Sequence, residues 1–503
     1  MNGSRRAIAG LLLGAAALTA CGTTVRSSVT TGSTQSGAGD VSGIAPANAN
    51  GAVPAGVTPV DSGTAKVTSD HSPGAHGVPS FDGGVSSAGA PAAVTLGPGV
   101  RADSVAIGLT IQSNNATVSS IAAAYNVQLP DTRAAYDALV SYINNHGGVG
   151  ARKLRPIYYT YDSSASTADQ IGQAACAHFT EDTSVFAALD AISVDSFNSC
   201  MQKRGRVMLP YGLYFGGEAT WKRYPNVVAA DGLPFNSAGK TLGDYLVRSG
   251  FLSKSTRVGA IVRSSADLAE SYQKGFVPIL ARAGLKVTEA HYVRDPQAAS
   301  DISGYTADIS SAVLKFRSSG VDRVVFFDTG SYAALVFSQN AEQQGYRPHY
   351  GFMSLNSIVA LQGSGSAAPR AQMTGAQGVS WEMNADGLAT SRTRSGQQCD
   401  AIMKAAGIAA TDAGTEASYL KTCQTFFLFK AAADLAGRSL NRDSFLASVD
   451  GFGSSFLATN TWNGLTQLSF GHHGGVSVYR PFAYREGCSC FAVSGAVQPV
   501  AAS

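Results

Sequence analysis

Residues 104–110 read SVAIGLT, a short and nearly continuous apolar run that is suited to a strand buried within a parallel sheet. A helix is expected to follow from about Asp131, because apolar side chains recur every four residues on one face as far as Ile143. The glycine pair at 147–148 then has the character of a helix end. This strand and helix predict the start of a β-α-β unit.

Strands and helices keep alternating along the rest of the chain. The first series is completed by strands at 155–161, 185–189 and 207–209 and by helices at 168–179 and 199–204. The second series has strands at 257–262, 287–293, 323–327 and 349–352 and helices at 267–283, 302–317 and 332–344. Each series predicts a parallel sheet with helices on both faces. Two consecutive series predict an α/β fold of two doubly wound lobes, because one core of this size would be too large.

The N-terminus has the layout of a secretory signal. Arg5 and Arg6 precede an apolar run over 7–18, and small residues follow up to Cys21. The run is too short to remain as a membrane-spanning helix. Residues 18–21, LTAC, resemble the bacterial lipobox, which implies cleavage before Cys21 and lipid attachment (palmitate among the acyl groups) to that cysteine. An ordinary signal-peptidase site near Cys21 remains the alternative.

A long segment between this signal and the first strand has a different composition. Residues 22–100 are rich in Gly, Ser, Thr, Ala, Val and Pro and carry few large apolar side chains. Such a segment cannot bury enough apolar surface to offset the entropy of ordering. We expect a disordered tether that holds the folded part away from a membrane surface.

Six cysteines remain once Cys21 is set aside, and an even number in an exported chain favours disulfides. They are Cys176, Cys200, Cys399, Cys423, Cys488 and Cys490. Pairing Cys176 with Cys200 would close a local loop within one lobe. The same holds for Cys399 with Cys423. A bridge between Cys488 and Cys490 would be strained and unusually reducible, so a free-thiol role stays open there. A CxC metal site is a weaker alternative, because no second pair has zinc spacing.

Several stretches resemble a known family. Residues 143–154, INNHGGVGARKL, look like the first helix and turn of the branched-chain amino-acid-binding proteins of ABC importers. The segments VGAIV at 258–262, YQKGF at 272–276 and AGLKV at 283–287 are similar to the start of the second lobe in that family. The order of elements matches from about Asp103 to Val493. The chain is therefore identified by resemblance as a substrate-binding lipoprotein of the type I periplasmic binding protein family.

That resemblance implies a three-crossing hinge between the lobes, with crossings near Ala230, Asn384 and Phe456. The implied divisions are a signal peptide at 1–21, the tether at 22–100, lobe 1 at 101–230 and 385–456, lobe 2 at 231–384 and 457–495, and a tail at 496–503. It also implies reversible capture of a small polar ligand, such as an amino acid, for an ABC permease in the membrane. We expect a monomer without cofactor, metal or nucleic-acid partner.

Ligands bind open α/β sheets at the carboxyl ends of the strands, where loops present unpaired N–H groups. Hydroxyls at Ser193 and Ser196 would suit a carboxylate. An ammonium would suit Asp267 or Asp328, and an aromatic wall would come from a nearby tyrosine. The candidate ligand-binding residues are Ser193, Asp195, Ser196, Tyr211, Asp267, Asp328, Tyr332 and Asn356.

Most of these candidates have a plainer alternative. Asp195, Ser196 and Asp267 stand where helix N-caps belong, and Tyr211 could plug the base of a lobe. Asp328 follows an apolar strand, where a carboxylate is costly unless it is paired or faces a cleft, so it is the strongest candidate. The segment Pro210-Tyr211-Gly212-Leu213 departs from the small residues and threonine of the family, and Met353-Ser354 lacks its acidic residue. These departures put an amino-acid ligand in doubt.

The sequence does not favour an enzyme. It contains no H-E-x-x-H, no G-x-S-x-G and no complete G-x-G-x-x-G. Residues 239–241, GKT, resemble the end of a phosphate-binding loop, but Pro234 stands where that motif requires its first glycine. The simpler interpretation is that these residues begin a helix. His472 and His473 are interpreted as surface or turn residues, because adjacent strand residues point to opposite faces. The net charge of +3 without a basic block does not suggest nucleic-acid binding. A ligand-sensing or ligand-less lipoprotein of the same fold is the main alternative.

Overall fold

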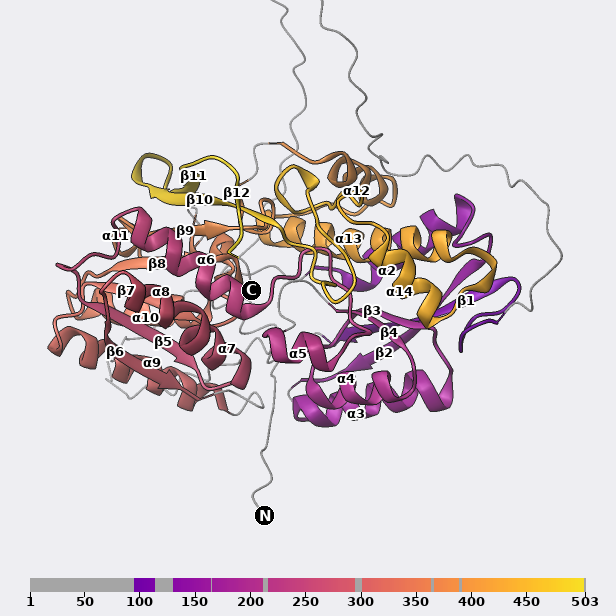
Figure 1. Ribbon diagram of the computed structural model, residues 1–503, viewed down its shortest axis with the longest axis horizontal. Coiled ribbons are helices and arrows are strands. Elements are labelled where there is room, and N and C mark those ends of the chain that lie inside the picture. The colour runs from indigo at the N-terminus through magenta and orange to yellow at the C-terminus, as the bar shows by residue number, and fades with distance from the viewer. Residues whose placement is uncertain are drawn as a thin grey trace, which may run out of the picture. The chain divides into compact units, whose positions relative to one another are not determined.

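The computed structural model describes residues 95–113, 130–163, 165–210, 216–294, 301–362, 366–388 and 391–501. These residues form two separate sheets (Figure 1). The first sheet has four parallel strands in the order β2-β1-β3-β4. Its strands are β1 (Ser104–Gln112), β2 (Lys153–Tyr161), β3 (Ala187–Ala191) and β4 (Val207–Pro210).

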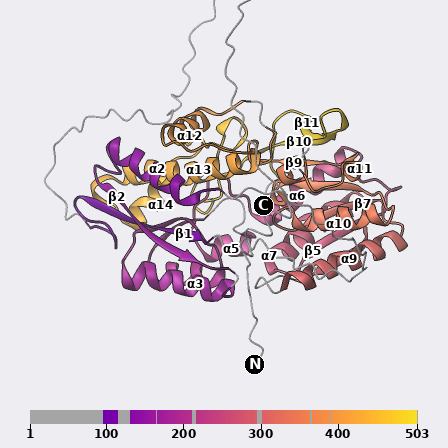
Figure 2. The same ribbon diagram turned by 180° about the vertical axis from the view of Figure 1, so that it is seen from behind.

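Helices cover both faces of the first sheet (Figure 2). Side chains of β1 alternate, so that Val105, Ile107 and Leu109 pack with α2, α13 and α14. On the opposite face, Gly108 allows the ring of Phe179 to lie against the strand, and α3 and α4 build a second core there. The helices are α2 (Thr132–Asn145), α3 (Ala168–Ala177) with a π-helical end (His178–Asp182), α4 (Asp195–Lys203), α12 (Arg394–Ala405), α13 (Ala413–Ala436) and α14 (Arg442–Asp450).

The second sheet has the order β11-β10-β9-β8-β7-β5-β6. Strands β5 to β9 are parallel, whereas β10 pairs antiparallel with β9, β11 and β12. The strands are β5 (Val258–Arg263), β6 (Val287–Val293), β7 (Arg323–Phe327), β8 (His349–Met353), β9 (Gln377–Ser380), β10 (Val478–Arg485), β11 (Cys490–Val493) and β12 (Gln498–Pro499). Residues 498–499, assigned above to a tail, therefore join this sheet, and the Ala501 N–H donates to the Thr241 hydroxyl at 3.0 Å.

Both faces of the second sheet are also covered by helices. Val258, Ala260 and Val262 of β5 pack with α6 and its neighbours, whereas Ile261 faces the core formed with α9 and α10. The helices are α6 (Phe235–Arg248), α7 (Ala266–Glu270), α8 (Val277–Arg282), α9 (Ile302–Ser318), α10 (Tyr332–Gln343) and α11 (Arg370–Met373). A short helix, α5 (Glu218–Arg223), lies between β4 and α6 in the chain.

The described residues pass between the cores of the two sheets three times, at 229–234, at 381–388 with 391–393, and at 456–477. Backbone hydrogen bonds join these passages. The Ala229 N–H donates to the His473 carbonyl at 2.9 Å, and the Met383 N–H donates to the Asn460 carbonyl at 2.9 Å. The expected fold class, two doubly wound lobes joined by three crossings, is confirmed. The boundaries assigned above to each lobe stay predictions.

One predicted helix, at 267–283, has a different form. The structure has α7, a π-helical segment (Ser271–Phe276) and α8 in its place. A β-carbon on Gly239 of α6 would lie 2.4 Å from the Ser271 carbonyl oxygen, so the two helices approach very closely here. The Ser271 hydroxyl also donates to the Phe235 carbonyl at 2.5 Å. The wider π turn occurs where α6 and the Ser271 segment are in contact. The periodicity of a single segment cannot predict such a tertiary contact.

The end of the predicted tether is part of the folded structure. Val100 is buried, and the Gly97 N–H donates to the Leu440 carbonyl at 2.9 Å. Gly99 has φ +75, and a β-carbon there would lie 2.4 Å from the Phe186 nitrogen. The tether prediction therefore extended too far, because these glycines allow a close approach of backbones.

The signal, the lipobox with Cys21 and most of the tether lie outside the described residues. In the part of the chain that the structure describes, no helix is long and apolar enough to cross a membrane.

Candidate functional site

The C-terminal edge of the second sheet carries a buried ion pair. Arg263 ends β5 and Asp328 directly follows β7, so neighbouring parallel strands bring them together. The Arg263 Nη2 lies 2.6 Å from Asp328 Oδ1, and the Asp328 side chain is fully buried. Tyr305 of α9 donates a hydrogen bond to the other carboxylate oxygen, and the Thr329 N–H donates to Oδ1 at 2.7 Å. We call Arg263, Tyr305 and Asp328 the Arg263 cluster.

The electrostatics of the Arg263 cluster follow from its burial. Desolvation raises the pKa of Asp328, and the positive charge of Arg263 opposes that shift. Burial, and then the Asp328 charge, raises the pKa of Tyr305 well above its ordinary value, so this phenol stays protonated and donates. Asp328 thus has its own cation, and a ligand ammonium would have to displace Arg263 to reach it.

Two further predicted residues lie beside this cluster. The ring of Tyr332 stacks on Tyr305 with centroids 5.7 Å apart, and its hydroxyl lies 2.8 Å from Thr306 Oγ1. Asn356 is almost fully buried, and its amide donates to the Asp328 carbonyl at 3.1 Å. The structure therefore brings Asp328, Tyr332 and Asn356 to one edge. Asn356 supports the backbone there through its internal hydrogen bonds.

The candidates on the first sheet also contact protein groups. The Asn198 amide donates to Ser193 Oγ at 3.2 Å, and the Ser196 hydroxyl donates to the Asp169 carbonyl at 3.1 Å. The capping alternative for Asp195 and Ser196 is wrong, because α4 begins at Asp195, four residues before the predicted start, and its N-cap has no side-chain hydrogen bond.

Asp195 and Asp267 both hold α5. Asp195 accepts a hydrogen bond from Tyr224 and lies 3.1 Å from Arg223 Nη1, at the C-terminal end of α5. Asp267 accepts hydrogen bonds at its N-terminal end, from the Gly217 N–H at 2.9 Å and the Thr220 hydroxyl at 2.6 Å. Asp195 comes from α4 beside the first sheet, and Asp267 comes from α7 beside the second. Helix α5 therefore ties the two together.

Asp267 does not have the N-cap role that was its alternative. The N-cap residue of α7 is Ser265, and Asp267 is only 4% exposed. Burial raises the pKa of Asp267, and the bonds from Thr220 and Gly217 oppose that shift. Tyr211 lies outside the described residues.

A second buried charged group, which sequence reasoning missed, lies where the passages meet. Lys421 of α13 places its Nζ 3.2 Å from Glu382 Oε2, and both side chains are nearly inaccessible. Asp231 of the first passage lies close enough to Glu382 of the second for its negative charge to raise the pKa of Glu382. We call Asp231, Glu382 and Lys421 the Lys421 cluster.

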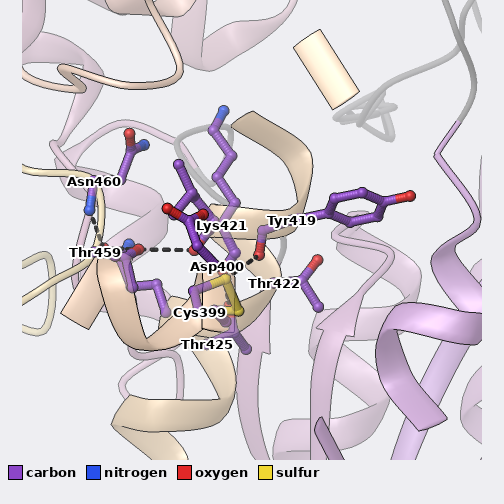
Figure 3. The surroundings of a disulfide bond; sticks show 12 residues. Cys399, Asp400, Tyr419, Lys421, Thr422, Thr425, Thr459 and Asn460 are labelled. Atoms are coloured by element: carbon purple, nitrogen blue, oxygen red, sulfur yellow. Dashed lines mark hydrogen bonds between the residues drawn. A yellow bond between two sulfur atoms is a disulfide. The ribbon is translucent and has the colours of Figure 1, made fainter. Parts of the chain in front are cut away.

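Burial raises the pKa of Asp231, and it raises that of Glu382 well above its ordinary value, while Lys421 lowers both. Figure 3 shows Lys421 on α13 next to Cys399, with Thr459 and Asn460 of the third passage close by. The Asn460 side chain accepts from the Asn384 N–H at 3.1 Å, which links the third passage to the second. The Lys421 cluster therefore lies at the structural centre of the hinge.

His473 differs from its prediction as a surface or turn residue. Its side chain is buried, with Nδ1 at 3.0 Å from the Pro225 carbonyl and Nε2 at 2.9 Å from Asp450 Oδ1. His472 is exposed in the adjoining turn. Both histidine nitrogens of His473 are thus used internally. Among the described residues, no group of three or more His, Cys, Asp or Glu side chains is arranged to hold a metal ion.

The chain belongs to the periplasmic binding protein family, whose model matches residues 116–468. A comparison with curated proteins found no match. Among solved structures, the chain is similar to a fatty acid ABC transporter substrate-binding protein from Thermomonospora curvata. The TM-score is 0.56 at 15% identity, with 80% of this chain and 95% of that chain covered.

Two other solved structures have comparable similarity. A solute-binding protein of an ABC transporter from Rhodopseudomonas palustris BisB5, in complex with 3,4-dihydroxybenzoic acid, gives a TM-score of 0.56 at 12% identity, covering 79% of this chain and 98% of that one. A branched-chain amino acid transporter substrate-binding protein from Streptococcus pneumoniae, in complex with isoleucine, gives 0.53 at 13% identity, covering 79% and 99%. At these identities the likeness shows the fold.

The two clusters differ in whether the sequence carried a signal for the residues that the prediction missed. Arg263 follows the same rule as Asp328, a charge at the carboxyl end of an apolar strand, and the rule could have identified it. Lys421 lies in a helix with apolar residues on several sides, and its partners are far away in the sequence. Asp231 and Glu382 carry no local signal at all, because only the packing of the passages brings them together.

Proposed function

We propose that this chain is an exported, lipid-anchored solute-binding protein that captures a small ligand between its two lobes for an ABC importer. The observation that carries the proposal is the family match over 116–468, together with two doubly wound sheets joined by three passages. Ligand binding would bridge the carboxyl edges of both sheets and shift a hinge equilibrium towards a closed form that a permease recognises. The lobe boundaries and the lipid at Cys21 are parts of the same proposal.

We further infer that the ligand carries a carboxylate. The ligands named for the similar structures, which are isoleucine, 3,4-dihydroxybenzoic acid and fatty acid, have this group in common. In this chain Asp328 is held by Arg263, and Asp267 is held by α5. Both candidate ammonium-binding carboxylates therefore have protein partners, which weakens the case for an amino acid and supports a carboxylate with another polar or apolar end.

The residues proposed to contact the ligand directly are Ser193 and Tyr332, with Tyr211 as a candidate from outside the described residues. Ser193 and Tyr332 are partly exposed; Ser193 lies two residues after β3, and Tyr332 begins the helix that follows β7. Asp195, Ser196, Asp267, Asp328 and Asn356 are proposed to position the surrounding loops. Asp267, Asp328 and Asn356 are buried, Asp195 is paired with Arg223, and the Ser196 hydroxyl donates to the Asp169 carbonyl.

The test is a thermal unfolding screen of the exported chain. The panel contains leucine, 4-hydroxybenzoate and a fatty acid, each paired with the amide in which an uncharged group replaces its carboxylate. A ligand specific to the native state adds about 2.7 kcal/mol of stability at a hundredfold excess over its Kd. We expect one acid to raise the unfolding midpoint and its amide to fail. If no acid in a broad panel moves the midpoint, the solute-binding proposal is overturned; if acid and amide act equally, only the carboxylate inference is.

The second candidate function is a sensory or ligand-less lipoprotein of the same fold. The internal pairing of Asp328 and Asp267 favours it, since it removes two groups that could grip a solute. Ligand-induced closure in solution, without uptake of that ligand by cells that depend on this chain, would support sensing over import.

A further inference from the structure

The three disulfides of the structure are of two kinds. Cys176–Cys200 and Cys399–Cys423 each have a sequence separation of 24, and each joins two helices, α3 to α4 and α12 to α13. Cys176, Cys399 and Cys423 are buried in the cores of the first sheet. Both pairings confirm the local loops expected from the sequence. Such bridges stabilise a fold by reducing the conformational freedom of the unfolded chain.

The third bridge, Cys488–Cys490, has a sequence separation of 2. A ring with a single intervening residue removes very little freedom from the unfolded chain, because the gain from a bridge grows with the loop it closes. Cys488 is exposed, and within the described residues neither cysteine belongs to a hydrophobic core. Stability therefore does not account for this bridge.

The bridge lies at the tip of the β10–β11 hairpin of the second sheet. A single 3-10 turn (Glu486–Cys488) leads to Ser489, which has φ +50, and Cys490 then pairs with Arg485 across the hairpin. Below the tip the hairpin is firmly held, because Phe491 is buried and its N–H donates to Gln362 Oε1 at 2.6 Å. Glu486 also accepts a hydrogen bond from Thr374 at 2.9 Å. This base would keep the two sulfurs near each other after reduction.

We propose that Cys488 and Cys490 form a thiol–disulfide exchange site that reacts with dithiols in the extracytoplasmic solvent. A thiolate of the dithiol attacks one sulfur of the bridge, the S–S bond breaks, and its electron pair leaves on the other cysteine as a thiolate. The second thiol of the donor then attacks the mixed disulfide and releases the first cysteine. The protein gains two electrons and two protons, and the dithiol becomes a disulfide.

This site is independent of solute binding, since it requires neither the sheet edges nor the hinge. Cys488 is exposed and its sulfur is open to in-line attack, whereas Cys176, Cys399 and Cys423 are buried and Cys200 is partly buried. Exchange is therefore confined to one end of the second sheet. The same fold would keep its two structural bridges oxidised while the hairpin bridge cycles.

The experiment uses the folded, fully oxidised chain and dithiothreitol as the probe. After brief exposure, free thiols are alkylated and each cysteine peptide is quantified by mass spectrometry. We expect Cys488 and Cys490 to be reduced at least about tenfold faster than the other four cysteines, since exchange depends on access to sulfur. One dithiothreitol should be oxidised per chain. Equal rates at all three bridges would overturn the proposal.

Variants separate exchange from a structural role. The pair Cys488→Ser with Cys490→Ser should abolish the fast phase and leave the thermal unfolding midpoint unchanged. The matched pair Cys399→Ser with Cys423→Ser should lower the midpoint and keep the fast phase. Cys490→Ser alone should trap a stable mixed disulfide at Cys488 with oxidised glutathione. If removing the hairpin bridge lowers the midpoint as much as removing the buried one, the bridge is structural and the proposal fails.

Discussion

The Arg263 cluster and the Lys421 cluster are both buried and charged, but they differ in charge balance. In the Arg263 cluster one cation faces one carboxylate, and a phenol completes the hydrogen bonding. In the Lys421 cluster one cation faces two carboxyl groups, with Asp190 and Asp386 also close enough to interact. The first is complete within one lobe, whereas the second draws its members from separate passages of the chain. The hinge region is therefore the part whose stability should depend on protons.

The largest effect is expected from Lys421→Met. It leaves the two acids without a cation in a site that excludes water, and breaking a buried pair in this way costs about 3–5 kcal/mol. The loss of stability should grow as the pH rises. Without Lys421 the buried acids must keep their protons to stay neutral, and holding protons costs more free energy at higher pH. Denaturant unfolding at several pH values measures this. The control is Lys421→Met combined with Glu382→Gln, which should recover part of the loss. A loss below about 1 kcal/mol would mean that the cluster is solvated.

The next effect concerns Asp386. Burial raises the pKa of this carboxyl to about 6 from its ordinary 3.8, while its bond from Ser354 opposes the shift. The folded state therefore holds the proton more tightly than the unfolded chain does, and stability falls as the pH rises from about 4 to about 6, by about 3 kcal/mol. Asp386→Asn should remove this share of the pH dependence. Asp190, whose pKa burial also raises to about 6, is the matched control, since Asp190→Asn should remove a separate and similar share.

A smaller effect is expected from Tyr305→Phe in the Arg263 cluster. The change removes one hydrogen bond to a charged acceptor and leaves the Arg263–Asp328 pair in place, so we expect a loss of about 2 kcal/mol with little change in pH dependence. Urea unfolding of the variant at low and high pH checks both parts. If the stability lost in this variant depended on pH as steeply as the loss in Lys421→Met, the proposed difference between the two clusters would be wrong.

Periodicity was enough to predict most of the fold. The strands at 287–293 and 323–327 have the predicted limits, and the helix at 302–317 is one residue longer in the structure. These elements are signalled by apolar side chains that are close in sequence, so local pattern contains the information. The helix at 267–283 is the exception, because its π turn goes with the close approach of Gly239.

The candidate site was predicted in part. Asp328, Tyr332 and Asn356 do lie together, because the carboxyl ends of parallel strands meet at one edge of a sheet. What each side chain binds could not be predicted. Arg263 satisfies Asp328, and α5 satisfies Asp267, through contacts that join distant parts of the chain.

By itself, the sequence predicted the alternation of strands and helices and the division into two sheets, and it favoured the pairing of the two disulfides that join helices. Each of these rests on local apolar pattern or on cysteines close along the chain. Only the tertiary structure decided which carboxylates are neutralised within the protein and that Asp231, Glu382 and Lys421 meet at the hinge. The physical reason is that the cost of a buried charge depends on the groups folded around it, and those groups come from distant segments.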